Sequence, residues 1–493
     1  MIADYLRLSP KGGENSLVKS LAAQIVLMVM CAIATSIIHS NLEHDYAGAL
    51  RAISVAVTPA LILQLCILRI RFRTVLAPPV LYAGLLSIFT SGWLILHGLG
   101  LEGESTDIIS RIHPAFVAEA AIFYVNAMGF YCLGAIIAGP GKGSIVGHVG
   151  KLRGYAKNVL AQKNAMRVVG WASIGLGVAP FLLVNVNNLQ VVLTSGYSAY
   201  YEDGARVGGA IGAFSYFFLV GIIFLGCSGS KVHANRMAVL LGCIAALRLV
   251  SGDRGEGFIL VLGALILWMN EKPWEDRRRV GWRAAVLVAL MMIVLTPAIG
   301  IARQSLGGEE LSFTGAFLEY NPLVETLLTL GTTIFPLVHV IRLVPDAEDY
   351  LLGGSYASGL LRLFPDALTP SSLEHLSRDP IYASPANWLM SVLGMSYGPG
   401  FTPFAEAYLN FGFTGGLLSM IAFGVLMTVI LRLPDAATPA RKAFSIATFV
   451  LCGFSVRGSF NFVLPFMFRY VLLPIVCVRL IQGSRLAPER KAD

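Results

Sequence analysis

Residues 114–138 of the chain read PAFVAEAAIFYVNAMGFYCLGAIIA, and Glu119 is the single charged side chain in this run. A bilayer core about 30 Å thick is spanned by about 20 helical residues, so the run is long and apolar enough to cross a membrane. Comparable runs recur throughout the 493 residues, of which 56% are hydrophobic and 13% charged. Soluble domains contain about 25% charged residues, so the composition excludes a water-soluble globular protein.

Twelve such runs predict one all-α polytopic membrane domain over residues 1–493, with about twelve transmembrane helices. The predicted spans lie at about 17–39, 47–68, 74–97, 114–138, 168–186, 207–227, 237–250, 257–270, 284–301, 411–431, 443–456 and 462–481. The seventh and eleventh runs are short for a bilayer. We therefore expect their outer ends to stop below the membrane surface.

The formal net charge of +8 is divided between the two sides of the predicted membrane. Short loops rich in Lys and Arg stay cytoplasmic. If the N-terminus is cytoplasmic, all ten lysines fall on that side, and the opposite side keeps only arginines and most of the acidic residues. This one-sided distribution predicts that both termini are cytoplasmic. The basic residues do not gather in one solvated domain, which excludes nucleic-acid binding as the reason for the charge.

One stretch outside the predicted membrane, residues 302–410, is too long for a passive connection and is predicted to be functional. Its segment 321–345 is apolar enough to imitate another span. Pro336 within the segment would break a helix, and an extra crossing would reverse the sidedness of everything that follows. We therefore expect helices that lie in the interface or re-enter the protein. The remainder, from 351 to 400, is rich in Gly, Pro, Ser and Tyr and is expected to be mostly ordered loop.

Three arginines lie next to the membrane on the side that lacks lysine. Arg254 is in the turn SGDRGEG at 251–257, Arg457 is in SVRGS at 455–459, and Arg303 follows the ninth predicted span. An arginine beside glycine exposes its guanidinium fork, which suits a phosphate or pyrophosphate. The alternative is that each arginine anchors a helix end at the lipid headgroups. A lysine would serve equally well as an anchor, so the exclusive use of arginine favours oxyanion binding.

Glu406 is the main candidate for a general base, because it lies in an apolar segment just before the tenth predicted span. It could instead be the ion-pair partner of one of the arginines. Asp253 is adjacent to Arg254 and is better suited to orienting that side chain. His339 is followed by Arg342 at helical spacing, so both are candidate substrate contacts, although a packed histidine is the simpler interpretation.

Tyr408 and Asn410 follow Glu406 on the same segment and are further candidate substrate contacts. Asn410 could also position the Glu406 carboxylate. Glu119 has no adjacent cation within its span, and a structural role for it is as probable as a functional one. The seven cysteines all lie within or at the ends of predicted spans, and the chain has no CxxC pair. We therefore predict no disulfide, no metal site and no cofactor.

These segments resemble the O-antigen polysaccharide polymerase (Wzy) family. The resemblance runs from about 250 to 460. It is carried by GDRG at 252–255, GGSY at 353–356, FP at 364–365 and, most specifically, GPGFTPFAEAYLNFG at 398–412.

The resemblance implies a GT-C type glycosyltransferase of the bacterial inner membrane. Such an enzyme joins undecaprenyl-pyrophosphate-linked oligosaccharide repeats on the periplasmic face, with release of undecaprenyl pyrophosphate, and outer-loop arginines contact the lipid-linked donor and acceptor. The matching arginines here are Arg254, Arg303 and Arg457. A chain-length regulator and a flippase are the expected protein partners, and membrane lipids surround the chain. No nucleic acid takes part.

Two other functions remain open at this level. A glycan ligase of similar architecture would use the same donor and arginines but a different acceptor surface in 302–410. A transporter or flippase for lipid-linked oligosaccharides would need charged residues along a path through the membrane. Few membrane-buried charges are present, and Glu119, Arg248 and Arg469 are the examples, so chemistry at one surface is favoured.

Overall fold

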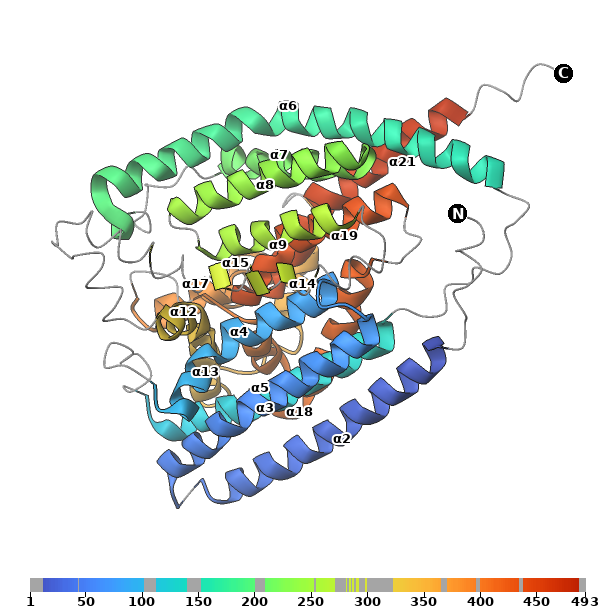
Figure 1. The fold of residues 1–493 in the computed structure, drawn as a ribbon. Coiled ribbons are helices and arrows are strands. Elements are labelled where there is room, and N and C mark those ends of the chain that lie inside the picture. The colour runs from blue at the N-terminus through green and yellow to red at the C-terminus, as the bar shows by residue number, and fades with distance from the viewer. Residues whose placement is uncertain are drawn as a thin grey trace.

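The computed structural model describes residues 12–42, 44–101, 112–139, 152–199, 209–251, 254–270, 322–364, 370–395, 400–433 and 438–486, with scattered positions between 281 and 298. Within these ranges every regular element is helical (Figure 1). The longer helices are α2 (Gly12–Ser40), α3 (Tyr46–Phe72), α4 (Pro78–Leu99), α5 (Pro114–Ala138), α6 (Leu152–Ala199), α7 (Gly209–Ser228), α8 (Lys231–Val250), α9 (Arg254–Asn270), α18 (Pro403–Leu431), α19 (Pro439–Cys452) and α21 (Leu473–Leu486).

Short helices fill the remainder. They are α12 (Pro322–Gly331), α13 (Phe335–Leu343), α14 (Gly354–Leu361), α15 (Glu374–Arg378), α16 (Pro380–Ala383), α17 (Pro385–Val392) and α20 (Val463–Phe466). Single turns of 3-10 helix form η3 (Thr332–Ile334), η5 (Ser371–Leu373), η6 (Gly453–Arg457) and η7 (Phe460–Phe462), and η8 (Met467–Leu472) is a π-helix.

The predicted polytopic all-α membrane architecture is confirmed. Ten helical stretches in the described part of the chain are long and apolar enough to span a bilayer. The sequence predicted about twelve. Nine of the predicted spans are among these ten, and the tenth, Thr326–Leu343, falls in the segment that was expected to re-enter the protein. The other three predicted spans are missing because α19 is shorter than a full span, α9 contributes only the short apolar stretch Gly255–Met269, and most of the predicted span 284–301 lies outside the described residues.

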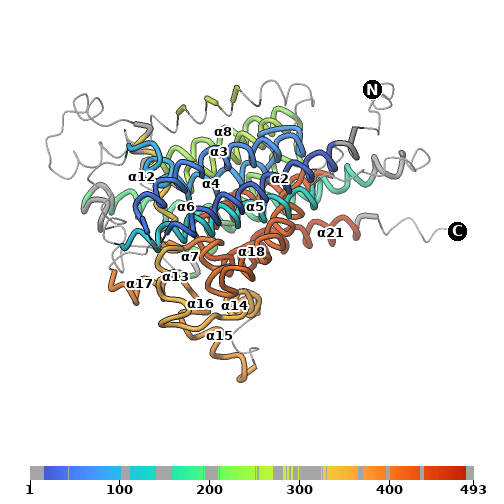
Figure 2. The backbone as a smooth tube through the Cα atoms, turned by 90° about the horizontal axis from the view of Figure 1, so that it is seen from below, coloured from blue at the N-terminus to red at the C-terminus, as the bar shows by residue number. Residues whose placement is uncertain are grey.

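The start of α2 and the end of α21 lie at the same end of the helix bundle in both views (Figures 1 and 2). The helices α12, α13 and α17 lie towards the opposite end. The bundle therefore has a terminal end, which holds the first residues of α2 and the last of α21, and a distal end, which holds α12, α13 and α17.

The apolar segment 322–343 has the composition of a span but is not one continuous helix. The turn η3 separates α12 from α13, and Pro336 stands in the first turn of α13, where its missing N–H costs nothing. Both short helices lie towards the distal end (Figures 1 and 2).

The connection from 351 to 400 contains more helix than the sequence predicted. Four short helices, α14 to α17, occupy most of its described part and gather at one side of the long helices (Figure 2). The prolines counted as loop signals, Pro380 and Pro385, stand instead at the first positions of α16 and α17. Proline is favoured there because its fixed φ suits a helix start.

The contact between α5 and α18 holds the centre of the bundle together. Gly134 of α5 faces the backbone of Ile421, and Gly424 of α18 faces the backbone of Tyr131, so that a Cβ at either glycine would collide with a carbonyl oxygen. Membrane helices lack a hydrophobic drive to associate and pack closely through such small residues. The two glycines therefore fix α18 against α5.

Candidate active site at the start of α18

The start of α18 carries the most specific part of the sequence motif. The Oγ1 atom of Thr402 accepts a hydrogen bond of 2.9 Å from the N–H of Ala405, and Pro403 occupies the first helical position. This cap and proline begin the helix earlier than the apolar run from 411 predicts. The sequence placed Glu406 just before the span, whereas the structure places it in the first turn of the spanning helix.

The Glu406 side chain is fully buried and joins three segments of the chain. Its Oε1 atom accepts a hydrogen bond of 2.7 Å from the hydroxyl of Ser355 in α14. Its Oε2 atom accepts a short hydrogen bond from the backbone N–H of Phe460, where η7 begins. The carboxylate therefore ties the start of α18 to α14 and to the segment that follows Arg457.

Asn410, one helical turn after Glu406, belongs to the same network and is also fully buried. Its Oδ1 atom accepts hydrogen bonds from the N–H groups of Gly353 at 3.0 Å and Ser355 at 3.4 Å. Its Nδ2 group donates to the Ser355 hydroxyl at 2.8 Å and to the Glu406 carbonyl oxygen at 2.7 Å. The predicted pair of Glu406 and Asn410 is thus brought together through Ser355.

Gly412 interrupts α18 directly after this network, with φ of 67° and ψ of −160°. A side chain would make this positive φ costly. The break frees carbonyl groups that would otherwise bond within the helix. Those of Leu409 and Asn410 instead accept hydrogen bonds from the N–H groups of Leu351 at 3.1 Å and Leu352 at 2.9 Å. The break therefore docks the chain entering α14 onto α18.

Arg457 ends η6 and is half-buried beside the same network. Its guanidinium carbon lies 5.9 Å from the centre of the Phe89 ring in α4. Its carbonyl oxygen accepts a hydrogen bond of 3.1 Å from the N–H of Phe401, and the hydroxyls of Tyr82 and Ser455 lie 2.8 Å apart within the same turn region. Among the described residues, no carboxylate lies within ion-pair distance of this guanidinium.

Tyr356 in α14 adds an aromatic wall next to Glu406. Its ring lies 5.8 Å from that of Phe460 and 6.0 Å from that of Phe411, measured between centres. Burial, followed by the charge of the Glu406 carboxylate, raises the pKa of the Tyr356 phenol well above its ordinary value. The phenol therefore stays protonated and can act only as a neutral hydrogen-bonding group.

The sequence and these contacts converge on one family. The family model of the O-antigen polysaccharide polymerase Wzy matches residues 22–486, which is nearly the whole chain. The chain belongs to this family. The recognition of the family from the sequence is therefore confirmed, and the 398–412 segment on which it rested contains Glu406 and Asn410.

Among curated proteins, the chain is 25% identical over 210 residues to Protein CapE of Staphylococcus aureus. The match covers 42% of this chain and 42% of that relative, so less than half of the relative is represented. No solved structure matches this chain. The assignment to the Wzy family therefore stands on the full-length family match.

The other two arginines expected in this Wzy family chain are only partly visible. Arg254 begins α9, but its side chain is outside the described atoms, and Asp253 and Arg303 lie outside the described residues. Glu256 lies two residues after Arg254 in α9. Its Oε2 atom is 3.6 Å from Nη1 of the buried Arg248 in α8. Arg248, which the sequence marked only as a membrane-buried charge, thus joins α8 to α9.

The structure does not bring His339 and Arg342 into the Glu406 network. His339 is buried in α13, and its ring lies edge-on to Phe335 with centres 4.3 Å apart. Within the described part of the chain, neither ring nitrogen has a hydrogen-bond partner. Arg342 is exposed on the same helix. The packed-histidine interpretation matches this environment, and a substrate contact for either residue stays a prediction.

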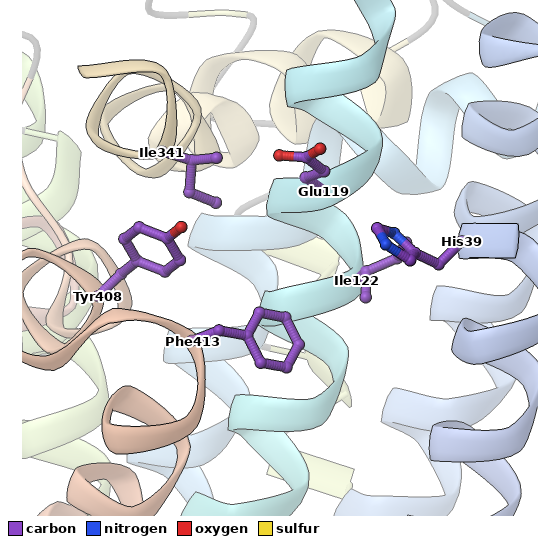
Figure 3. Close-up of a pocket in the computed structure, with 6 residues that line it drawn as sticks. All are labelled: His39, Glu119, Ile122, Ile341, Tyr408 and Phe413. Carbon is purple, nitrogen blue, oxygen red and sulfur yellow. The ribbon is translucent and has the colours of Figure 1, made fainter. Parts of the chain in front are cut away.

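A pocket of about 230 Å³ lies between α2, α5, α13 and α18 (Figure 3). Four helices supply its lining: α2 gives His39, α5 gives Glu119 and Ile122, α13 gives Ile341, and α18 gives Tyr408 and Phe413. The sequence named Tyr408 and noted the isolated charge of Glu119, but nothing local indicated that these side chains share a cavity. Within the described residues, no group of three or more His, Cys, Asp or Glu side chains could hold a metal ion.

Proposed function

We propose that this Wzy family chain polymerises undecaprenyl-pyrophosphate-linked oligosaccharide repeats into O-antigen or a related surface polysaccharide. The growing glycan on one lipid pyrophosphate would be transferred en bloc to a second lipid-linked repeat, with release of undecaprenyl pyrophosphate. The family match and the multi-pass helical architecture support a membrane-embedded polymerase.

The observation that carries the proposal is the environment of the Arg457 guanidinium. A half-buried guanidinium stacked on Phe89, with no carboxylate partner in the described part of the chain, is a cation prepared for an external anion. Donors already fixed in place stabilise developing charge without reorganisation, and arginine binds phosphate oxygens in pairs. We propose that Arg457, together with Arg254 and Arg303, binds the pyrophosphate that leaves.

The reaction needs no external energy source, because the donor sugar is already joined to a good leaving group. The non-reducing-end hydroxyl of the acceptor repeat loses its proton to Glu406, and its oxygen forms a bond to C1 of the donor sugar. The bond from C1 to the pyrophosphate oxygen breaks, and its electron pair leaves with undecaprenyl pyrophosphate. The arginines neutralise the negative charge that develops there.

Glu406 fits the role of base only if the acceptor reaches its carboxylate, which has no exposed surface. The Ser355 hydroxyl donates to Oε1 at 2.7 Å, the distance expected for a bound acceptor hydroxyl. We propose that the acceptor hydroxyl displaces Ser355 at this oxygen, while Phe460 and Asn410 keep the carboxylate in position. Asp253, His339, Arg342 and Tyr408 are proposed to contact the lipid-linked substrates.

The membrane side and the partners are part of the same proposal. The one-sided lysines favour a cytoplasmic position for the terminal end, where α2 starts and α21 ends (Figure 1). The distal end would then face the periplasm of a bacterial inner membrane, where a flippase delivers lipid-linked repeats and a chain-length regulator sets the length of the product.

The test is turnover by the purified chain in lipid nanodiscs, supplied with lipid-linked repeats extracted from a strain that lacks it. We expect a ladder of polymers and one undecaprenyl pyrophosphate released per new bond. Glu406→Gln should lower the rate about 10²–10⁴-fold, as expected for loss of a general base, whereas Ser355→Ala should keep most of it.

Three other outcomes would reject parts of the proposal. A glycan joined to an acceptor other than a second repeat would identify a ligase. Transbilayer movement of the repeat without any new covalent bond would identify a flippase. Equal losses in Glu406→Gln and Ser355→Ala, each with a lowered melting temperature, would make Glu406 a positioning residue.

A further inference from the structure

The pocket between α2, α5, α13 and α18 contains an ionisable side chain that the mechanism above does not use. Glu119 stands in the second turn of α5, inside a helix long enough to span the membrane, and its side chain is half-buried. Within the described part of the chain, its carboxylate forms no hydrogen bond and no ion pair, and the imidazole of His39, which lines the same pocket, acts on it electrostatically. An unpaired carboxylate in a membrane helix is costly and therefore indicates a ligand.

The lining of the pocket combines hydrogen-bonding groups with aromatic faces. Glu119, His39 and the Tyr408 phenol supply polar atoms, and the Tyr408 and Phe413 rings supply apolar faces (Figure 3). Both rings are held against α5 by Phe123, at centre distances of 5.2 Å and 5.5 Å. An oriented carboxylate beside rigid aromatic faces suits a sugar ring, whose hydroxyls donate hydrogen bonds and whose C–H face is apolar.

The size and charge of the pocket exclude other occupants. Its volume of about 230 Å³ is below the roughly 300–1,000 Å³ of pockets for drug-sized ligands, so it accommodates one ring and not a whole repeat. A lipid tail would leave the carboxylate and imidazole unpaired. A pyrophosphate would be repelled by Glu119. A single carboxylate with one imidazole also falls short of the ligand set for a metal ion.

The pocket lies across α18 from the Glu406 network. Residues two positions apart on a helix point to opposite sides, because each residue turns by about 100°. Glu406 faces Ser355 and Phe460, whereas Tyr408 faces the pocket. A helix about 10 Å wide therefore separates the two sites. The occupant would be a sugar remote from the bond being formed, which is where an enzyme gains binding energy and selectivity without touching the reacting atoms.

We propose that this pocket is a subsite for one sugar ring of the lipid-linked repeat, with Glu119 as hydrogen-bond acceptor and Tyr408 and Phe413 as stacking faces. The proposal rests on the function proposed above and adds the residues that select the substrate. It assigns Glu119 a binding role and no part in proton transfer.

The experiment measures binding of the oligosaccharide released from the extracted lipid-linked repeat by mild acid. This probe carries no pyrophosphate, so its binding does not depend on the arginines. Saturation-transfer NMR with the full chain in nanodiscs should show contact with the unaltered protein and with Arg457→Ala. Glu119→Gln should weaken binding by about tenfold to a hundredfold, as expected for loss of a charge-assisted hydrogen bond.

The matched control is Asp349→Asn, which removes an exposed carboxylate between α13 and α14 and should change nothing. In turnover assays, Glu119→Gln should raise KM far more than it lowers kcat. Because the carboxylate forms no hydrogen bond or ion pair with the described residues, the same variant should melt no lower than the unaltered chain, which excludes misfolding as the cause.

The other outcomes of these measurements each reject either the sugar subsite or the polymerase function. Unaltered affinity in Glu119→Gln, or no oligosaccharide binding to the unaltered protein, overturns the subsite. Normal KM for Glu119→Gln together with an inactive Arg457→Ala overturns the subsite but leaves the polymerase intact. Binding that depends on Glu119 in a protein that makes no polymer overturns the proposed function and leaves the sugar site standing.

Discussion

The terminal end of the bundle and the region around Glu406 use arginine differently. At the terminal end, Arg71 and Arg432 donate hydrogen bonds to the carbonyl groups of Ile136 and Ala138, where α5 ends, at 3.2 Å and 3.4 Å. Arg441 donates to the carbonyl of Ile430 and to two others at the end of α18. These side chains satisfy carbonyls that have no partner within the helix and complement the helix dipole.

Arg457 lies away from this end, beside the middle of α4, and has no such carbonyl among the described residues. Its guanidinium stacks on Phe89, and its main chain is held by Phe401. The segment around it is fixed by the carboxylate of Glu406, which bonds the backbone of Phe460. Anchoring of helix ends therefore explains arginines at one end of the molecule but not Arg457. This difference separates the two explanations that the sequence left open for arginine.

The strongest test of this difference replaces one arginine in each of the two regions by alanine and compares the polymerisation rates. Arg457→Ala should lower the polymerisation rate about 10²–10³-fold, because it removes a preorganised donor to the leaving group. Arg441→Ala at the terminal end should leave the rate nearly unchanged and lower only the stability. Polymer ladders on gels from a strain lacking the chain, with expression verified, provide the measurement.

Arg457→Lys distinguishes charge from geometry, because it keeps the positive charge and removes the two-pronged guanidinium. If the Arg457→Ala variant still makes full-length polymer, Arg457 does not bind the leaving pyrophosphate as proposed. Full activity in Arg457→Lys would show that a point charge is sufficient.

A smaller effect is expected from loosening the network around Glu406. Asn410→Ala leaves the buried N–H groups of Gly353 and Ser355 without their acceptor, at a cost of about 1–3 kcal/mol for such a group. We expect a lower melting temperature in detergent and faster hydrogen exchange at residues 353–355. Asn387→Ala, at an exposed position of α17, is the control. Equal stability of the two variants would contradict a role for Asn410 in fixing α14.

The smallest effect concerns the break in α18. Gly412→Ala places a Cβ at a φ of 67° and against the ring of Tyr350, with a strain of about 1–2 kcal/mol. The melting temperature should fall modestly. Gly84→Ala in α4 is the matched control, because nothing lies within 4 Å of a Cβ at that position, and it should be neutral or stabilising. A more stable Gly412→Ala variant would mean that α18 can run straight without the docked 351–352 segment.

Much of the fold could be predicted from hydropathy. Most of the predicted spans correspond to helices in the structure, because a bilayer about 30 Å thick demands an apolar run that is visible in the sequence. The helix that begins at Pro403 was predicted to start too late, since its first turn is defined by a cap and a proline and not by apolarity. The short helices between 354 and 392 were missed because their prolines were interpreted as breakers.

The candidate site was predictable only as separate pieces. Glu406, Asn410 and Arg457 each stand in a segment that the sequence singled out, and all three lie within the range matched by the Wzy family model. Ser355 and Phe460 carried no signal as partners of Glu406, because they are 51 and 54 residues away along the chain. His339 and Arg342, joined with the site on grounds of spacing, lie on a helix that points them elsewhere.

The sequence by itself determined that this protein is a bundle of membrane helices, because the requirement for apolar length acts on each segment separately. It also determined the family, because the 398–412 motif is contiguous. Only the tertiary structure decided which groups meet. The packing of α5 against α18 through Gly134 and Gly424 brings Glu119 to Tyr408, and the break at Gly412 lets α14 bring Ser355 to Glu406. Contacts between segments far apart in the chain depend on that packing, which hydropathy does not encode.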